Sequence, residues 1–118
     1  MNVRELLAWQ WSDYAGKHRN RVNLLIHIVA IPLFMLGCVI ALVALFKGLG
    51  LIFLGLLAMA LSVVVQGVGH KFETVRPAPF KGFPDFVRRV FFEQWVTFPR
   101  YVLSGGWSRA VSGKAGTE

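Results

Sequence analysis

The sequence contains three histidines, and their positions suggest a shared site. His27 lies near the start of one long apolar run and His70 lies at the end of a second. The mean of their positions falls in the Lys47–Leu49 connection, so in an antiparallel hairpin the two would lie at the same height. His18 would face the other way on a straight helix and joins them only if the chain bends within Lys17–Asn23. Three converging neutral imidazoles suit Zn, Cu or Fe(II).

Polar neighbours of the histidines are candidates to orient them. Asn23 precedes His27 by four residues, which places both on one helix face. Gln66 stands in the same relation to His70. Each amide could hydrogen-bond the imidazole nitrogen that does not bind the metal. Glu73 could be a fourth ligand or a hydrogen-bond partner of a histidine, or it could form a surface ion pair with neighbouring basic residues.

Two apolar runs must position these side chains. Residues 24–46 carry no formal charge, and residues 49–69 contain Ser62 and Gln66 as their polar side chains. Each run reaches the roughly 20 residues with which a helix crosses a bilayer. Charged residues make up 16% of the chain, against about 25% in soluble domains. The sequence predicts an all-α integral membrane protein built on a transmembrane hairpin. Two core helices of a soluble protein are disfavoured, because too little chain remains to cover them.

An amphipathic helix is expected before the hairpin, over about residues 3–17. Leu7, Trp11, Tyr14 and His18 recur there on one helical face. Aromatic rings with one polar edge suit the level of the lipid headgroups. We therefore expect an interfacial helix followed by the bend.

A second interfacial helix is expected after the hairpin, over about residues 86–98, with Asp85 as its N-cap. Prolines interrupt the preceding stretch, and the charges of the helix argue against a third span. The whole chain, 1–118, is expected to form one membrane domain. Its parts are a surface helix and bend (1–23), the hairpin (24–69), a cytoplasmic-side loop and interfacial helix (70–107), and a disordered tail (108–118).

The net charge of +7 is distributed on both sides of the apolar runs and not in one dense stripe. This pattern favours anionic lipid headgroups over nucleic acid as the partner. Only Lys47 lies between the runs, so both termini are predicted to face the cytoplasm. The single Cys38 excludes a disulfide framework and sites with several cysteine ligands.

A longer pattern around the histidines resembles a known family. It consists of His18-x4-Asn23-x3-His27-x4-Pro32 and, after two apolar spans, Gln66-x2-Gly69-His70-x-Phe72-Glu73-x2-Arg76-Pro77-Ala78. This pattern is similar to that of the 2-hydroxy fatty-acid dioxygenases of the fungal endoplasmic reticulum and their small bacterial members, which act in phytosphingosine breakdown. The similarity covers residues 14–78. The later stretch, 93–107, looks like a feature of the bacterial members, and no role is assigned to it.

The resemblance implies an Fe(II)-dependent α-oxidation, in which O2 shortens a 2-hydroxy fatty acid by one carbon. His18, His27 and His70 would bind the iron and leave three positions for the substrate's carboxylate and 2-hydroxyl and for O2. Arg76 or Lys17 would hold the substrate carboxylate. A bacterial inner membrane is favoured over the endoplasmic reticulum. A homodimer would help to enclose a site for a long acyl chain.

Two other classes of function remain open at this stage. A non-catalytic membrane hairpin that scaffolds a partner or binds lipid explains the apolar runs and basic flanks, but not the matched height of the histidines. A haem protein with His27 and His70 as axial ligands also fits those heights, and a Soret band would identify it. Serine or cysteine hydrolase chemistry has no support, since Cys38 lies in the middle of a span.

Overall fold

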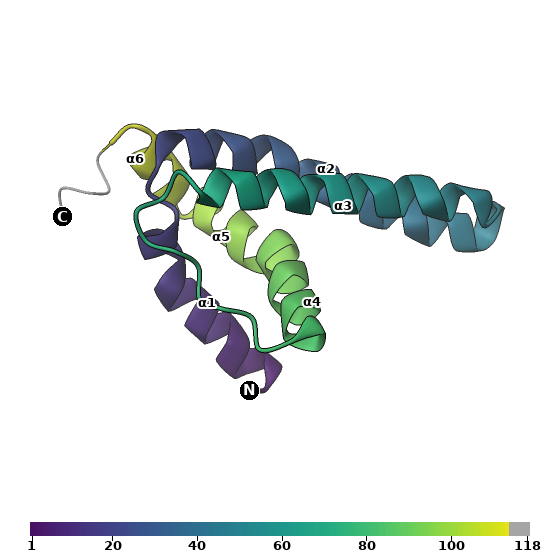
Figure 1. Ribbon diagram of the computed structural model, residues 1–118, viewed down its shortest axis with the longest axis horizontal. Helices are drawn as coiled ribbons and strands as arrows, with labels where there is room; N and C mark the ends of the chain where they lie inside the picture. Colours follow the sequence, from purple (N-terminus) through teal and green to yellow (C-terminus); the bar gives the residue numbers. More distant parts are fainter. Residues whose placement is uncertain (114–118) are drawn as a thin grey trace.

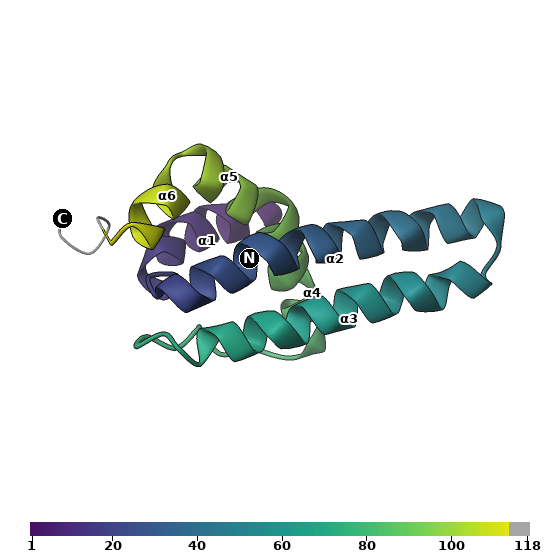
Figure 2. The ribbon, with the colours of Figure 1, turned by 90° about the horizontal axis from the view of Figure 1, so that it is seen from above.

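The structure is a computed structural model that describes residues 1–113, and all the regular elements in this range are helical. Two long helices, α2 (Arg21–Lys47) and α3 (Gly50–His70), form an antiparallel hairpin along the long axis of the molecule (Figures 1 and 2). The shorter elements gather at the open end of the hairpin. They are α1 (Val3–Lys17), α4 (Phe83–Phe92), the π-helical turn η1 (Glu93–Thr97), α5 (Phe98–Leu103) and α6 (Gly106–Val111).

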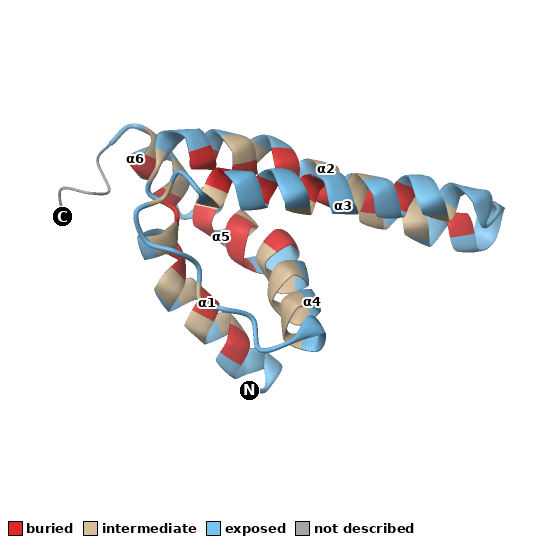
Figure 3. Ribbon diagram, viewed as in Figure 1, coloured by how far each residue is buried: buried red, intermediate tan, exposed pale blue. Residues whose placement is uncertain are grey.

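The hairpin exposes an apolar surface along most of its length (Figure 3). Phe46 and Phe53, near its turn, are 82% and 75% exposed. Only 28% and 17% of the most apolar windows of α2 and α3 are buried, whereas the core helix of a soluble protein is mostly buried. The prediction of two helices long and apolar enough to cross a membrane is therefore confirmed.

The two long helices pack closely where each contributes a glycine. A Cβ atom added to Gly55 would lie 2.7 Å from the carbonyl oxygen of Gly37 and 2.8 Å from the backbone nitrogen of Ala41. No side chain fits at that separation. Further along, the Ser62 hydroxyl on α3 donates to the carbonyl oxygen of Ala30 on α2. These contacts fix the register that sets His27 opposite His70.

Gly55→Ala is expected to lower the free energy of unfolding by about 1–3 kcal/mol, because overpacking forces the two backbones apart. Gly50→Ala on the same helix is the matched control, since a Cβ there meets no atom within 4 Å. The control should be as stable as the parent or more stable, because alanine is the better helix former. Denaturant unfolding in detergent, followed by circular dichroism, measures both. Equal changes in the free energy of unfolding of the two variants would contradict the close contact between the helices.

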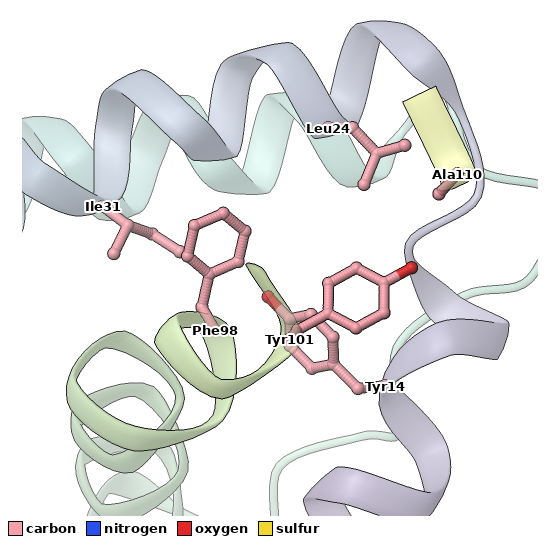
Figure 4. Packing of buried hydrophobic residues seen from close by; sticks show 6 residues of the cluster. All are labelled: Tyr14, Leu24, Ile31, Phe98, Tyr101 and Ala110. Atoms are coloured by element: carbon pink, nitrogen blue, oxygen red, sulfur yellow. The ribbon is translucent and has the colours of Figure 1, made fainter. Parts of the chain in front are cut away.

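The predicted N-terminal helix has the expected bounds, and its buried face agrees in part with the predicted one. Tyr14 and His18 are buried as predicted, whereas Leu6 and Gln10 are buried in place of Leu7 and Trp11. Tyr14 is 4% exposed, so its ring does not face the surroundings as an interfacial residue would. It packs in the core cluster formed by Tyr14, Leu24, Ile31, Phe98, Tyr101 and Ala110 (Figure 4). Here the ring is covered by protein, because Phe98 and Tyr101 of α5 pack against it.

The helix after the hairpin begins earlier than predicted. It starts at Phe83, and Asp85 is therefore not its N-cap but lies in its first turn, where Oδ2 accepts the N–H of Lys81 at 2.9 Å. Helical structure continues beyond Phe98 through α5. The π turn η1 ends at Thr97, two residues before Pro99, whose missing N–H removes a hydrogen bond from the α-helical ladder.

The tail was predicted to be disordered from residue 108 onwards, but the structure shows helix beyond that point. Residues 106–111 form α6, which packs on α2. Trp107 Nε1 donates to the carbonyl oxygen of Leu24 at 2.9 Å, and Ala110 lies in the core. These contacts order the segment despite its small and polar composition. The rest of the predicted tail, 114–118, lies outside the described residues.

Candidate metal centre

Four side chains converge at the open end of the hairpin. His18 follows α1, His27 lies on α2, His70 ends α3, and Glu93 begins η1. One potential ligand atom from each lies within 4.8 Å of the others. The ring centroids of the three histidines are 4.7 to 4.9 Å apart. The structure thus places His27 and His70 at the same height, as the hairpin symmetry predicts.

The bend that His18 requires is present. Residues 18–20 are not helical and separate α1 from α2. Asn20 caps α2, because its Oδ1 accepts the N–H of Val22 at 2.9 Å and that of Asn23 at 3.2 Å. The cap stops α2 from extending backwards, and the chain turns so that His18 faces the other two histidines.

Backbone carbonyls orient two of the imidazoles. His18 Nδ1 lies 2.8 Å from the carbonyl oxygen of Tyr14, and His27 Nδ1 lies 3.0 Å from that of Asn23. A carbonyl oxygen only accepts, so Nδ1 of each ring carries a hydrogen, and in the neutral ring Nε2 presents a lone pair. Metal-binding histidines commonly donate their other N–H to a carbonyl in this way.

Three imidazole nitrogens are buried without a hydrogen-bond partner among residues 1–113. They are His18 Nε2, His27 Nε2 and His70 Nδ1. An unpaired buried polar atom costs about 1–3 kcal/mol, so three such atoms converging on one point are unexpected in a cluster that only packs. With a carboxylate they form a donor set of nitrogen and oxygen that suits several divalent transition metals. The residues present therefore fit a metal ion.

Glu93 supplies the carboxylate. Its Oε2 lies 3.5 Å from His18 Nε2 and 3.7 Å from His27 Nε2, beyond a strong hydrogen bond, and accepts the Tyr14 hydroxyl at 2.9 Å. Burial acts to raise the pKa of Glu93, but the interaction with His18, followed by the charges of His27 and His70, outweighs it and lowers the pKa to about 2. The surrounding imidazoles thus keep this carboxyl ionised.

Tyr14 supports both His18 and Glu93. Its ring stacks on His18 with centroids 3.7 Å apart, and its carbonyl oxygen is the partner of His18 Nδ1. Burial, and then the neighbouring Glu93, raise the pKa of the Tyr14 hydroxyl well above its usual value. The hydroxyl therefore stays protonated and acts as a hydrogen-bond donor to Glu93.

The amide side chains expected to orient the histidines have other partners. Gln66 forms a reciprocal pair with Gln94 on η1, with N–O distances of 2.7 and 2.9 Å, and also donates to Ser62. Asn23 reaches His27 through its backbone carbonyl and not through its side-chain amide. The amides thus join helices near the centre, and the carbonyls orient the rings.

The structure places Glu73 outside the group of four converging side chains. Its carboxylate accepts the backbone N–H groups of Arg19 and Asn20 at 3.0 Å and the side-chain amide of Asn23 at 2.7 Å. Glu73 thus ties the segment after α3 to the bend that carries His18. Its role in the structure is to hold that bend.

A cavity of about 350 Å³ adjoins the cluster. His18, His70 and Glu93 form part of its wall, and both basic residues proposed for the substrate carboxylate, Lys17 and Arg76, also line it. The remainder of the wall is largely apolar and comes from α1, α3, α4 and the connection between α3 and α4. An amphiphilic acid would fit this distribution of side chains.

The haem alternative does not fit the geometry. The rings of His27 and His70 meet edge to face, with centroids 4.9 Å apart and planes at 88°. The ring centroid of His18 lies 4.9 Å from that of His27 and 4.7 Å from that of His70. A porphyrin between His27 and His70 would need a flat slot that these rings do not leave.

Sequence reasoning missed Glu93, although one signal pointed to it. It is the sole charged residue between Arg89 and Arg100, in a stretch rich in aromatic residues. A carboxylate in such surroundings needs a partner when it is buried. The π turn that begins at Glu93 is a second signal, visible only in the structure, because π turns are frequent at functional sites.

The fold and the cluster define a class of small helical protein, in which a long hairpin and a cap of short helices hold three histidines and a glutamate. The family model described as 2-hydroxy-palmitic acid dioxygenase Mpo1-like matches residues 5–99, and the chain belongs to this family. The match includes Glu93, which lies beyond the motif recognised in the sequence. No curated protein and no solved structure matches the chain.

Proposed function

We propose that the protein is an Fe(II)-dependent dioxygenase that converts 2-hydroxy fatty acids to acids one carbon shorter. The observation that carries this proposal is the set of three partnerless buried imidazole nitrogens, which converge with Glu93 beside the cavity. The name of the family supports oxygenation of a 2-hydroxy fatty acid. Iron as the metal and α-oxidation as the reaction are our assignments.

The proposed reaction balances with one O2, as R–CH(OH)–COOH + O2 → R–COOH + CO2 + H2O. The bond between C1 and C2 breaks, C2 becomes the new carboxyl carbon, and C1 leaves as CO2. The two carbons together lose four electrons, which reduce O2. Iron held by His18, His27, His70 and Glu93 would supply the redox chemistry that O2 activation requires.

The residues around the cluster would bind and orient the substrate. Arg76 and Lys17 carry the positive charge that attracts the carboxylate. Lys17 already pairs with Asp13 at 3.2 Å, so Arg76 is the stronger candidate. The Tyr14 hydroxyl holds Glu93 in place, and the apolar walls exclude water from the head of the substrate.

The hairpin would anchor this site at a membrane. Its exposed apolar surface suits the interior of a bilayer, and the basic flanks favour the cytoplasmic side for both termini. The histidines lie at the end of the hairpin remote from its turn, so the site would face the cytoplasmic leaflet of a bacterial inner membrane. A fatty acid already dissolved in that leaflet could reach the cavity without crossing water.

Iron-loaded protein, purified in detergent without oxygen, is expected to convert 2-hydroxypalmitic acid to pentadecanoic acid and CO2 when O2 is admitted. Mass spectrometry of the acids and an oxygen electrode measure product and O2 in parallel, with one O2 consumed for each acid shortened. The oxidation needs a redox-active metal, so only the iron-loaded form should consume O2 and form the shortened acid.

Zinc-loaded protein is the control, because Zn²⁺ occupies such sites without redox chemistry. It should consume no O2. Full iron occupancy without O2 uptake would overturn the proposed reaction and leave a metal-binding membrane protein. Failure to bind any metal would favour the scaffold or lipid-binding alternative.

A further inference from the structure

The cavity continues away from the metal centre along the hairpin. Gly67 and Val63 of α3 line one wall, and Phe86 and Val90 of α4 contribute to the wall as well. With a helical rise of 1.5 Å per residue, Gly67 lies about 4–5 Å and Val63 about 10 Å along the axis from His70. The two α3 residues therefore mark successive depths measured from the cluster.

Gly67 leaves the cavity wall without a side chain. A Cβ there would meet no atom within 4 Å, although the residue lines the cavity. By contrast, a Cβ on Gly37, Gly55 or Gly69 would collide with the neighbouring long helix. Helix packing thus explains those three glycines but not Gly67. The space beside Gly67 is available to a ligand.

The cavity wall combines basic and apolar side chains. Its cationic residues are Lys17, Lys71, Arg76 and Arg89, and Val63, Phe86 and Val90 provide apolar surface. A fatty acid combines the complementary groups, a carboxylate head and a hydrocarbon tail. Each methylene transferred from water to such a surface raises affinity about fourfold.

We propose that the strip of α3 from Gly67 to Val63 binds the acyl chain against Phe86 and Val90 of α4. Side-chain volume at Gly67 and Val63 then sets the longest chain that the site accepts. Gly67 contacts the first carbons after the head group, and Val63 contacts carbons further along. This inference rests on the proposed function for the chemistry of the head group.

The test places larger side chains at the two depths and compares 2-hydroxybutyric, 2-hydroxyoctanoic and 2-hydroxypalmitic acids. Gly67→Leu should lower kcat/KM for both longer acids by about tenfold or more relative to the shortest acid, since displacing two methylenes suffices. Val63→Trp should produce that loss for 2-hydroxypalmitic acid alone. The order of the two effects along α3 is the signature of an acyl path.

Matched controls lie on the same helix. Gly50 and Val64 do not line the cavity, so Gly50→Leu and Val64→Trp should leave the chain-length profile within about twofold of the parent. A profile that shifts equally in the controls would indicate a general effect of bulk on the hairpin. A profile that shifts in no variant, with the parent active, would overturn the acyl path and leave the proposed reaction intact.

A second measurement needs no turnover. Zinc-loaded protein in nanodiscs is irradiated with a diazirine-bearing 2-hydroxy fatty acid, with and without excess 2-hydroxypalmitic acid. Crosslinks at Phe86 and Val90 that the competitor removes are expected in the parent and should be lost in Gly67→Leu. Competed crosslinks confined to other positions would overturn the inference. An inactive parent that still shows the expected crosslinks would overturn the reaction and retain the acyl site.

Discussion

His27→Ala is expected to lower metal affinity by more than about 100-fold, since even residues that only orient metal ligands contribute about 10–100-fold. His27 is fully buried, and its Nε2 is one of the three converging nitrogens without a hydrogen-bond partner. No other imidazole among the described residues lies close enough to replace it. Anaerobic titration with Fe(II) or with Co(II), whose visible spectrum reports on its ligands, measures the affinity.

The stability of the metal-free protein distinguishes a metal ligand from a residue that only packs. In a metal site, the unpaired His27 nitrogen is a cost to the apo fold, so His27→Leu should leave the apo protein about as stable as the parent or more stable. Metal at 100 times its Kd should stabilise the parent by about 2.7 kcal/mol and should not stabilise the variant. Equal stabilisation of both would show that His27 is not a ligand. Loss of apo stability alone would point to a packing role.

The hairpin and the meeting of two histidines were predictable from local rules. Two apolar runs joined by a short connection define the partners and direction of the long helices, and symmetry about the turn then places His27 beside His70. The bend before α2 was predictable as well, because polar residues between Lys17 and Asn23 supply the Asn20 cap. These features depend on contacts between residues close in sequence or on the pairing of the two long helices alone.

The fourth member of the cluster was not predictable in this way. Glu93 reaches the histidines because the helix starting at Phe83 crosses the end of the hairpin and forms a π turn at the crossing. The crossing depends on side chains distant in sequence, such as Gln94 against Gln66 and Tyr14 against Glu93. Hydrophobic periodicity alone contains no information about these pairs.

Glu73 was a reasonable candidate ligand because it lies three residues from His70. Sequence proximity does not reveal that the bend before α2 presents two backbone N–H groups, at Arg19 and Asn20, that need an acceptor. The carboxylate of Glu73 meets that need. The two glutamates therefore have different roles, and a pair of conservative substitutions can separate them.

Glu93→Gln is expected to weaken Co(II) or Fe(II) binding by about 10–100-fold, whereas Glu73→Gln should leave metal affinity within about threefold, given the size of ligand and surface effects. Glutamine at position 93 can still accept the Tyr14 hydroxyl, so packing is preserved while the negative charge that would bind a metal is lost. Glu73→Gln should instead lower the free energy of unfolding by about 2 kcal/mol, because hydrogen bonds to a charged acceptor contribute about 1.5–3 kcal/mol each. Spectroscopic metal titration and denaturant unfolding on both variants give the two readouts. The opposite pattern, with affinity lost in Glu73→Gln alone, would assign the carboxylate ligand to Glu73 and remove η1 from the metal centre.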